Sequence, residues 1–253
     1  MGFEIDLKGR NVLLTGGSKG IGAASVRLLH KAGANVFFTY LSDEAGAQEL
    51  CRELGDRVAI ARCDVSDSAL LPDLVADCLS RMGSLDVLVN NAAIFSSNPF
   101  DGADYQTWKD GWQRTFSVNL FGPADLSFLV LREMRRKGSG KIINVASRSG
   151  HRGELRFPDY GASKAALINL TKSLARSCAK DGIVSIAVAP GFIETDMASE
   201  ELRTRRAEVE AEIPSRRVGT PDEVASIITF FASDLGNYAN GAVIDVNAGS
   251  YVR

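Results

Sequence analysis

Short apolar runs alternate along the chain with longer stretches of helical character. The apolar runs predict strands at Asn11–Thr15, Asn35–Tyr40, Val58–Cys63, Leu85–Asn90, Lys141–Ser147, Val184–Ala189 and Ala242–Val246. Several of them are unbroken series of Val, Ile, Leu and Phe, which is typical of strands buried on both faces. The intervening stretches are predicted to be helical near 20–32, 43–54, 67–82, 106–137, 159–180 and 221–234. Alternating strands and helices indicate a parallel sheet with right-handed crossovers and helices on both faces.

Seven strands fit a single doubly wound α/β domain of the Rossmann type over residues 1–253, and no linker or repeat interrupts the pattern. Only the stretch 192–218 departs from it, and its mixed charges favour a solvated helix. We expect residues 192–215 to form a substrate lid. Its apolar members Phe192, Met197, Leu202 and Ile213 are expected to face the substrate, and the charged Arg203, Arg205 and Glu208 to face solvent.

The composition narrows the class of protein. The chain has 253 residues, of which 45% are hydrophobic and 24% charged, so disorder, collagen and coiled coil are excluded. With a net charge of −2, the chain has no overall positive potential that would attract nucleic acid or an anionic membrane. No apolar run is long enough to span a bilayer. The four cysteines are irregularly spaced and the two histidines are few, so we expect reduced thiols, a cytoplasmic protein and no metal site.

A glycine-rich turn follows the first predicted strand and leads into a helix. It reads Gly16-Gly17-Ser18-Lys19-Gly20-Ile21-Gly22, a GxxxGxG spacing rather than a Walker A loop. Such a turn lets a phosphate approach the backbone, where the free N–H groups of the helix start can bind it. This pattern after a strand predicts a dinucleotide-binding loop, in which Ser18 and Ile21 also contribute to the site.

Nucleotide choice depends on the end of the second strand. An acidic residue there would hold the ribose of NAD and repel the extra phosphate of NADP, but the strand ends at Tyr40, and Ser42 comes before any acid. Lys19 can bring a positive charge to the same corner. We therefore expect NADP(H) to be preferred, with NAD(H) possible. Asp64, before Val65, could accept from adenine or could cap a helix that begins near Ser66.

A serine at the end of the fifth strand is followed by a Tyr-x-x-x-Lys pair. Ser147 lies at the sheet edge where ligands of such folds bind, and Tyr160 and Lys164 share one helical face. An ammonium group beside the phenol would lower its pKa, so that Tyr160 could exchange a proton with a carbonyl or alcohol that Ser147 holds. Tyr105 and Lys109 have the same spacing, but no strand ending in serine precedes them, which indicates a surface pair.

These motifs together resemble the short-chain dehydrogenase/reductase family over nearly the whole chain. They stand here as Thr15-Gly16-xxx-Gly20-Ile21-Gly22, Asp64-Val65, Asn90-Asn91-Ala92, Asn119, Ser147, Tyr160-xxx-Lys164 and Pro190-Gly191. The resemblance implies hydride transfer between a nicotinamide and a carbonyl or alcohol carbon. It implies that Tyr160 is the general acid/base, that Ser147 polarises the substrate oxygen, and that Lys164 lowers the pKa of the tyrosine and binds the nicotinamide ribose. Asn119 would hold a water of the proton relay.

The resemblance also implies further cofactor contacts. They would come from Asn91, Ala92, Pro190, Gly191, Ile193 and Thr195. The family usually has glycine at the position of Ala93, so the turn there is expected to be slightly altered.

Within the family, the segments Pro190–Met197 and Val246–Gly249 are similar to 3-oxoacyl-[acyl-carrier-protein] reductases, and sugar, polyol or small-ketone dehydrogenases stay open. The partners implied are a small carbonyl or alcohol substrate, with an acyl carrier protein possible, and further copies of the chain in a homotetramer. A basic patch for the carrier could come from Lys137, Lys141 and Lys180, although Asp181 weakens it. The charged loop between Ser147 and Tyr160 leaves a polar or anionic substrate open. A non-catalytic dinucleotide sensor is a remote alternative, since a fold does not fix a function.

Overall fold

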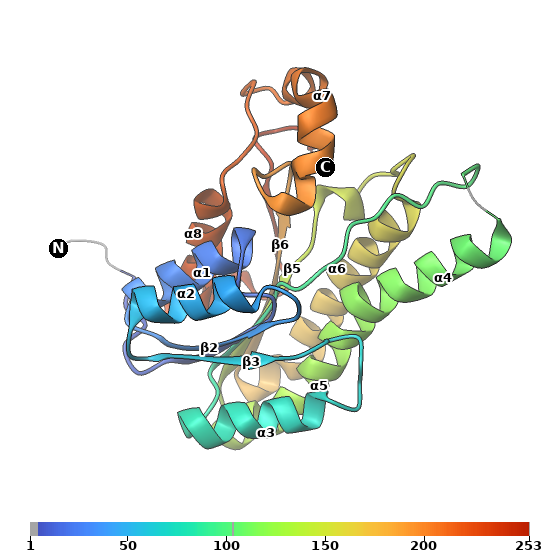
Figure 1. The fold of residues 1–253 in the computed structure, drawn as a ribbon. Helices are drawn as coiled ribbons and strands as arrows, with labels where there is room; N and C mark the ends of the chain where they lie inside the picture. The colour runs from blue at the N-terminus through green and yellow to red at the C-terminus, as the bar shows by residue number, and fades with distance from the viewer. Residues whose placement is uncertain (1–4, 103, 253) are drawn as a thin grey trace.

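The computed structural model describes residues 5–102 and 104–252, and Figure 1 shows their arrangement. Its strands are β1 Asn11–Leu14, β2 Asn35–Tyr40, β3 Val58–Arg62, β4 Val87–Asn90, β5 Gly140–Val145, β6 Ile183–Pro190 and β7 Val243–Val246. They form one parallel sheet in the order β3-β2-β1-β4-β5-β6-β7. The order reverses between β1 and β4, which opens a crevice at the carboxyl ends of the strands. The predicted doubly wound fold is confirmed.

Two layers of helices cover the sheet. The helices are α1 Gly20–Lys31, α2 Glu44–Leu54, α3 Leu71–Met82, α4 Tyr105–Phe116, α5 Gly122–Lys137, α6 Pro158–Cys178, α7 Ser199–Glu212 and α8 Pro221–Ala232. Apolar side chains of α1, α2 and α8 form one core with one face of the sheet, and those of α3, α5 and α6 form a second core on the other face (Figure 1). Side chains alternate across a strand, so the strands supply both cores.

The long helix predicted over 106–137 is interrupted. A π-helical turn, Ser117–Phe121, separates α4 from α5 and carries the fully buried Asn119. The extra residue of such a turn redirects the helix axis and is common at functional sites. The prediction was wrong here because the turn is held by tertiary hydrogen bonds from Asn119 to Ile94, which a helical pattern in the sequence does not reveal.

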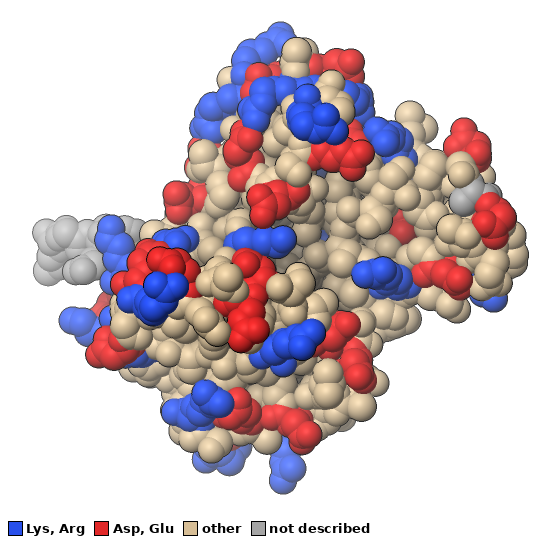
Figure 2. Space-filling view, in the orientation of Figure 1, with Lys and Arg blue, Asp and Glu red and all other residues tan. Residues whose placement is uncertain are grey.

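The charged stretch after β6 forms α7, which confirms the predicted solvated helix and stands apart from the sheet in Figure 1. Figure 2 shows side chains of both charges over this part of the surface. The prediction of which side chains face the substrate was partly wrong. Leu202 and Ile213 pack with Val209 and Val218 in a small core of their own, and Arg205 lines the main cavity. A helix outside the main layers must bury its own apolar side chains. Some of the side chains that were expected to face the substrate therefore pack against each other instead.

No helix in the described ranges has the length and apolar content that a bilayer crossing requires.

Candidate functional site

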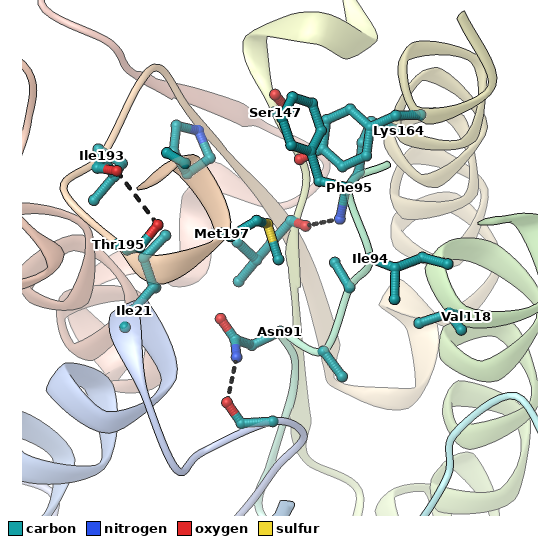
Figure 3. A pocket seen from close by; sticks show the side chains of 18 of the residues that line it. Ile21, Asn91, Ile94, Phe95, Val118, Ser147, Lys164, Ile193, Thr195 and Met197 are labelled. Atoms are coloured by element: carbon teal, nitrogen blue, oxygen red, sulfur yellow. Dashed lines mark hydrogen bonds between the residues drawn. The ribbon is translucent and has the colours of Figure 1, made fainter. Parts of the chain in front are cut away.

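A cavity of about 900 Å³ opens where the carboxyl ends of the strands meet α6 and α7. Figure 3 shows side chains from both halves of the chain around it. All of the predicted cofactor residues line this cavity: Gly16, Ser18, Lys19, Gly20, Ile21, Gly22, Tyr40, Ser42, Asp64, Val65, Asn91, Ala92, Tyr160, Lys164, Pro190, Gly191, Ile193 and Thr195. Ser147 lines it too, whereas Asn119 lies behind the wall.

The glycine turn needs its glycines for close backbone contacts. Gly16 has a φ of +70°, and a Cβ there would lie 3.0 Å from the Cα of Ala92. A Cβ on Gly22 would lie 2.0 Å from the carbonyl oxygen of Gly16, so a side chain there would push α1 away from the turn. The first turn of α1 has no acidic residue and no side-chain cap, which leaves its N–H groups free to bind an anion.

The end of β4 is tied to this turn by Thr15, which begins the glycine motif but was not predicted to be a site residue. Its hydroxyl accepts hydrogen bonds from the backbone N–H groups of Asn91 and Ala92, both at 3.0 Å. The amide of Asn91 donates to the carbonyl oxygens of Thr15 and Gly16 at 2.9 Å, and its side chain is labelled in Figure 3. Adjacent ends of parallel strands carrying Thr and Asn were the available signal. These bonds fix the floor of the cavity.

The region that decides nucleotide choice carries a lysine and no free acid. The ammonium group of Lys19 lies 3.9 Å from the carboxylate of Asp196, and both side chains are exposed. Asp43 lines the cavity, but its carboxylate accepts from the backbone of Gly46 and caps α2. Asp64 accepts from the backbone and hydroxyl of Ser66, so it stabilises a turn while also lining the cavity. The expected helix near Ser66 does not form, because α3 begins only at Leu71, so Asp64 does not cap a helix, and its contact with adenine stays a prediction.

Ser147, Tyr160 and Lys164 meet at one side of the cavity. Ser147 lies two residues after the end of β5 in extended conformation, and its hydroxyl accepts from the backbone N–H of Ser149 at 3.1 Å. Tyr160 and Lys164 lie in the first two turns of α6, both buried, with the Lys164 nitrogen 5.6 Å from the centre of the tyrosine ring. The hydroxyl of Ser147 acts on that of Tyr160 and lowers its pKa. By contrast, Tyr105 is largely exposed at the start of α4, as predicted.

The pKa values of this group differ from the expectation. Burial raises the pKa of Tyr160 to about 12 and outweighs the lowering by the Ser147 hydroxyl. Burial also lowers the pKa of Lys164 to about 7, and its ammonium donates to the carbonyl of Val145 at 2.8 Å. The expected lowering of the tyrosine pKa by Lys164 is therefore wrong for this structure, because desolvation penalises both charged forms. A phenol that stays protonated at neutral pH is suited to donate a proton.

Asn119 is held by backbone on one side and by a hydroxyl on the other. Its oxygen accepts from the N–H of Ile94 at 2.9 Å, and its nitrogen donates to the carbonyl of Ile94 and to the hydroxyl of Ser163. Ser163 in turn donates to the carbonyl of Tyr160 at 2.8 Å. This chain links the wall of the cavity to the helix that carries the tyrosine. Ser163 was missed because a serine inside a helix has no signal in the sequence. A role of Asn119 toward water stays a prediction.

Aromatic side chains complete the wall around the tyrosine. Phe95 stacks on Phe157 with 3.9 Å between ring centres and contacts Tyr160 edge-on at 4.8 Å. The segment before Phe95 leaves β4 without a positive φ at Ala93, and the expected alteration of this turn relative to the family stays a prediction. Bonds to the backbone of Ala92 and Ile94 hold the segment on both sides of Ala93.

Two of the three lysines expected to form a basic patch for a carrier protein are engaged by other side chains or backbone, whereas Lys180 is exposed. Lys141 is 5% exposed and donates to the carbonyl of Ser233 and the side chain of Asn237. It lies at the amino end of β5, away from the cavity, because strands of a parallel sheet share their direction. Lys137 is engaged by Asp86 at the same edge.

Comparison with known proteins agrees with this arrangement. A family model described as "Enoyl-(Acyl carrier protein) reductase" matches residues 16–251. A 3-oxoacyl-[acyl-carrier-protein] reductase of Vibrio cholerae is 38% identical over 248 residues, which cover 98% of this chain and 100% of that protein. The reductase of the same name from Chlamydia pneumoniae is 39% identical over 249 residues, covering 98% and 99%.

Solved structures show the same fold. A short-chain dehydrogenase/reductase of Brucella melitensis, described as a glucose/ribitol dehydrogenase, superposes with a TM-score of 0.90 at 34% identity, covering 99% of this chain and 100% of that one. A Beutenbergia cavernae protein with NADP bound at low occupancy superposes with a TM-score of 0.90 at 32% identity, covering 98% and 99%. The glycine turn meets Ser147, Tyr160 and Lys164 in one cavity of a doubly wound sheet, and the likeness to these enzymes runs over the full length of the chain. The chain therefore belongs to the short-chain dehydrogenase/reductase family and is an oxidoreductase.

Proposed function

We propose that the protein is an NADP(H)-dependent ketoreductase that reduces 3-oxoacyl compounds to the corresponding alcohols. The observation that carries the proposal is the meeting of Ser147, Tyr160 and Lys164 with the glycine turn in a single cavity. The curated relatives named above are 3-oxoacyl-[acyl-carrier-protein] reductases, which supports this substrate class over sugars and polyols. All four cysteines are free thiols, which supports a cytoplasmic location.

The residues at the cavity fit a dinucleotide. The close backbone contacts of Gly16 and Gly22 hold the turn against the uncapped start of α1, and together they form a cradle for a diphosphate. The cavity is also lined by Pro190, Gly191, Phe192, Ile193 and Thr195, which would enclose the nicotinamide end. When bound there, the cofactor supplies the hydride. The protein supplies the rest of the chemistry.

Ser147 and Tyr160 act on the substrate oxygen. Their hydroxyls hold the carbonyl oxygen by hydrogen bonds, which polarises the carbon toward the incoming hydride. Tyr160, protonated because its pKa is about 12, gives its proton to the oxygen as negative charge develops there. Lys164, in the next turn of α6, binds the ribose of the nicotinamide and supplies the proton that Tyr160 has given away. The aromatic wall of Phe95 and Phe157 shields this step from water.

The test is NADPH oxidation with 3-oxoacyl thioesters, offered both as small thioesters and bound to an acyl carrier protein. We expect turnover of the small thioesters, and faster turnover with the carrier would identify it as a partner. A protein that binds NADPH with a fluorescence change but turns over no ketone would be a dinucleotide sensor. That result would overturn the proposed function.

The preference for NADP(H) rests on Lys19. Pairing of its ammonium group with the extra phosphate is worth roughly 10- to 100-fold in kcat/KM, as for charged hydrogen bonds in general. The ion pair with Asp196 is exposed and long, so it competes weakly with a phosphate. Lys19→Met should reduce the ratio of kcat/KM for NADPH over NADH, whereas Lys31→Met, at the far end of α1, should leave the ratio unchanged. Equal values for both cofactors in the unmodified protein would refute the preference.

A further inference from the structure

Arg148 directly follows the serine of the site, and its guanidinium is buried in the cavity wall. The side chain is 4% exposed and lines the cavity. Its Nη1 has no hydrogen-bond partner in the part of the chain that the structure describes. The ion pair with Glu212 spans 3.9 Å, which is too long for a hydrogen bond. The charge of Arg148 is therefore only partly balanced.

The surroundings place the guanidinium on the substrate side of Ser147. Arg148 begins the short helical turn Arg148–Gly150, and its guanidinium carbon lies 4.8 Å from the ring centre of Phe192, which also lines the cavity. Phe192 follows the Pro190-Gly191 pair. The guanidinium thus packs against the segment that leads into α7, one residue along the chain from Ser147.

The neighbouring charges do not satisfy Arg148. The carboxylate of Glu154 accepts from the hydroxyl of Ser149 at 2.8 Å and lies 3.3 Å from Arg152. Burial lowers the pKa of Arg148, and the nearby Arg152 lowers it further, against smaller opposite effects of Glu154 and Glu212. Glu212 itself is half exposed at the end of α7. Within residues 148–157, the three arginines Arg148, Arg152 and Arg156 stand against one carboxylate, that of Glu154, and all four residues line the cavity.

A buried cation without hydrogen bonds destabilises a fold, and proteins rarely keep one unless a partner completes it. The planar fork of a guanidinium matches a carboxylate, which can accept two parallel hydrogen bonds. We propose that Arg148 binds a carboxylate of the substrate near the reacting carbonyl, so that the enzyme selects anionic 3-oxo compounds over neutral ones. The proposal rests on the proposed ketoreductase function and names its substrate class.

Two matched substrate pairs test the selection and distinguish the two sources of a carboxylate. The first pair is acetoacetate and acetoacetamide, which differ in charge at nearly equal size. The second is the N-acetylcysteamine thioesters of 3-oxoglutarate, with a free carboxylate, and of 3-oxopentanoate, without one. For at least one pair, we expect kcat/KM with NADPH to favour the anionic member by roughly 10- to 100-fold, the range of a charged hydrogen bond. The preferred pair tells whether a free keto acid or an acyl thioester is taken.

Three variants separate binding from structure. Arg148→Gln should abolish the preference, mainly by raising the KM of the anionic member. Glu212→Gln should increase the preference, because the substitution removes the carboxylate that competes for Arg148. Glu212 is half exposed, so this variant tests the proposal even if Arg148→Gln does not fold. Arg203→Gln, an exposed arginine on α7 outside the main cavity, should match the unmodified protein.

The outcomes are distinct. Reduction of the neutral members as fast as the anionic ones would overturn the assignment of Arg148 while leaving the ketoreductase function intact. A purely structural role would appear as equal losses for both members in Arg148→Gln, with no change of preference in Glu212→Gln. No turnover of any 3-oxo compound would overturn the proposed function itself.

Discussion

At the scale of single residues, Tyr160 and Tyr105 differ in what surrounds them, although both begin a Tyr-x-x-x-Lys sequence. Tyr160 is 9% exposed and contacts Ser147 and Phe95, whereas Tyr105 is 71% exposed and contacts Trp108. Only the buried hydroxyl is positioned to give a proton to a bound substrate. The spacing of the motif is therefore weak evidence, and its environment decides its role.

Tyr160→Phe removes the proton donor while the ring still packs against Phe95. We expect kcat to fall roughly 100- to 10,000-fold, the usual range for general acid–base catalysis, with little change in the dissociation constant for NADPH. Steady-state kinetics and a fluorescence titration measure the two quantities. Tyr105→Phe is the matched control and should be close to neutral. Similar losses in both variants would show that the wrong pair has been assigned.

We expect the buried ammonium group of Lys164 to destabilise the fold. Burial lowers its pKa from 10.5 to about 7, so the unfolded chain binds the proton more tightly than the native protein does. The free energy of unfolding is therefore reduced by the full amount below pH 7 and is not reduced above pH 10.5. The penalty corresponds to at most ~5 kcal/mol, since one pKa unit equals ~1.4 kcal/mol. Lys164→Met should therefore raise the melting temperature relative to the unmodified protein more at pH 6 than at pH 10.

Melting curves between pH 6 and pH 10 measure this difference. Lys172→Met removes an exposed lysine from the same helix and corrects for the general effect of losing a lysine. A difference between Lys164→Met and the unmodified protein that stays constant or grows with pH would contradict the prediction.

At the scale of elements, the site is assembled by contacts between segments that are distant in sequence. The π-helical turn joins Asn119 to Ile94, and Asn119 joins α6 through Ser163. The lid candidate is joined to the loop before α6 by Glu201, which is 6% exposed and accepts from Arg156 at 2.9 Å and from Arg205 at 3.2 Å. These bonds are polar and few, so they can break and re-form more readily than the apolar cores.

We propose that residues 192–215 act as a lid over the substrate. Amide hydrogen exchange in this segment should slow when NADP and a substrate analogue bind, because closure orders it and excludes water. Arg156→Gln removes the bond to Glu201 and should speed exchange in the segment before ligand is added. Arg203→Gln, on the exposed side of α7, serves as the control. Strong and equal protection with and without ligand would show a fixed helix rather than a lid.

At the scale of the whole molecule, a row of aromatic side chains runs along α4 into α5. Tyr105, Trp108, Trp112, Phe116 and Phe121 contact one another in sequence, with ring centres 5.4 to 6.4 Å apart. Phe121 and Phe128 are 55% and 76% exposed. An exposed apolar face of this kind on a soluble domain typically marks an association surface. We propose that it joins copies of the chain in the predicted homotetramer.

Sedimentation at micromolar concentration should show a tetramer for the unmodified protein. Phe128→Asp places a charge in the proposed interface at a position exposed in a single chain, so it should dissociate the assembly without unfolding the chain. Lys172→Asp, which places the same negative side chain on an exposed part of α6, should leave the assembly intact. A stable monomer of the unmodified protein would refute the proposal.

The sequence alone determined the fold class and the cofactor cavity. Continuous apolar runs depend on neighbouring residues, so each strand was placed to within a few positions. The glycine turn and its position between a strand and a helix are likewise local, and so Gly16, Gly20 and Gly22 were placed correctly at the crevice. The family motifs then specified Ser147, Tyr160 and Lys164.

Only the tertiary structure decided how deeply these residues are buried and which hydrogen bonds and charges surround them. The break in the predicted 106–137 helix, the burial of Leu202 and Ile213 and the position of Arg205 in the cavity all arise from contacts between distant segments. The same holds for the pKa values of Tyr160 and Lys164, which are set by desolvation that neither side chain produces alone. Local pattern determines which element a residue joins, whereas burial, charge balance and hydrogen-bond partners depend on what the rest of the chain packs against it.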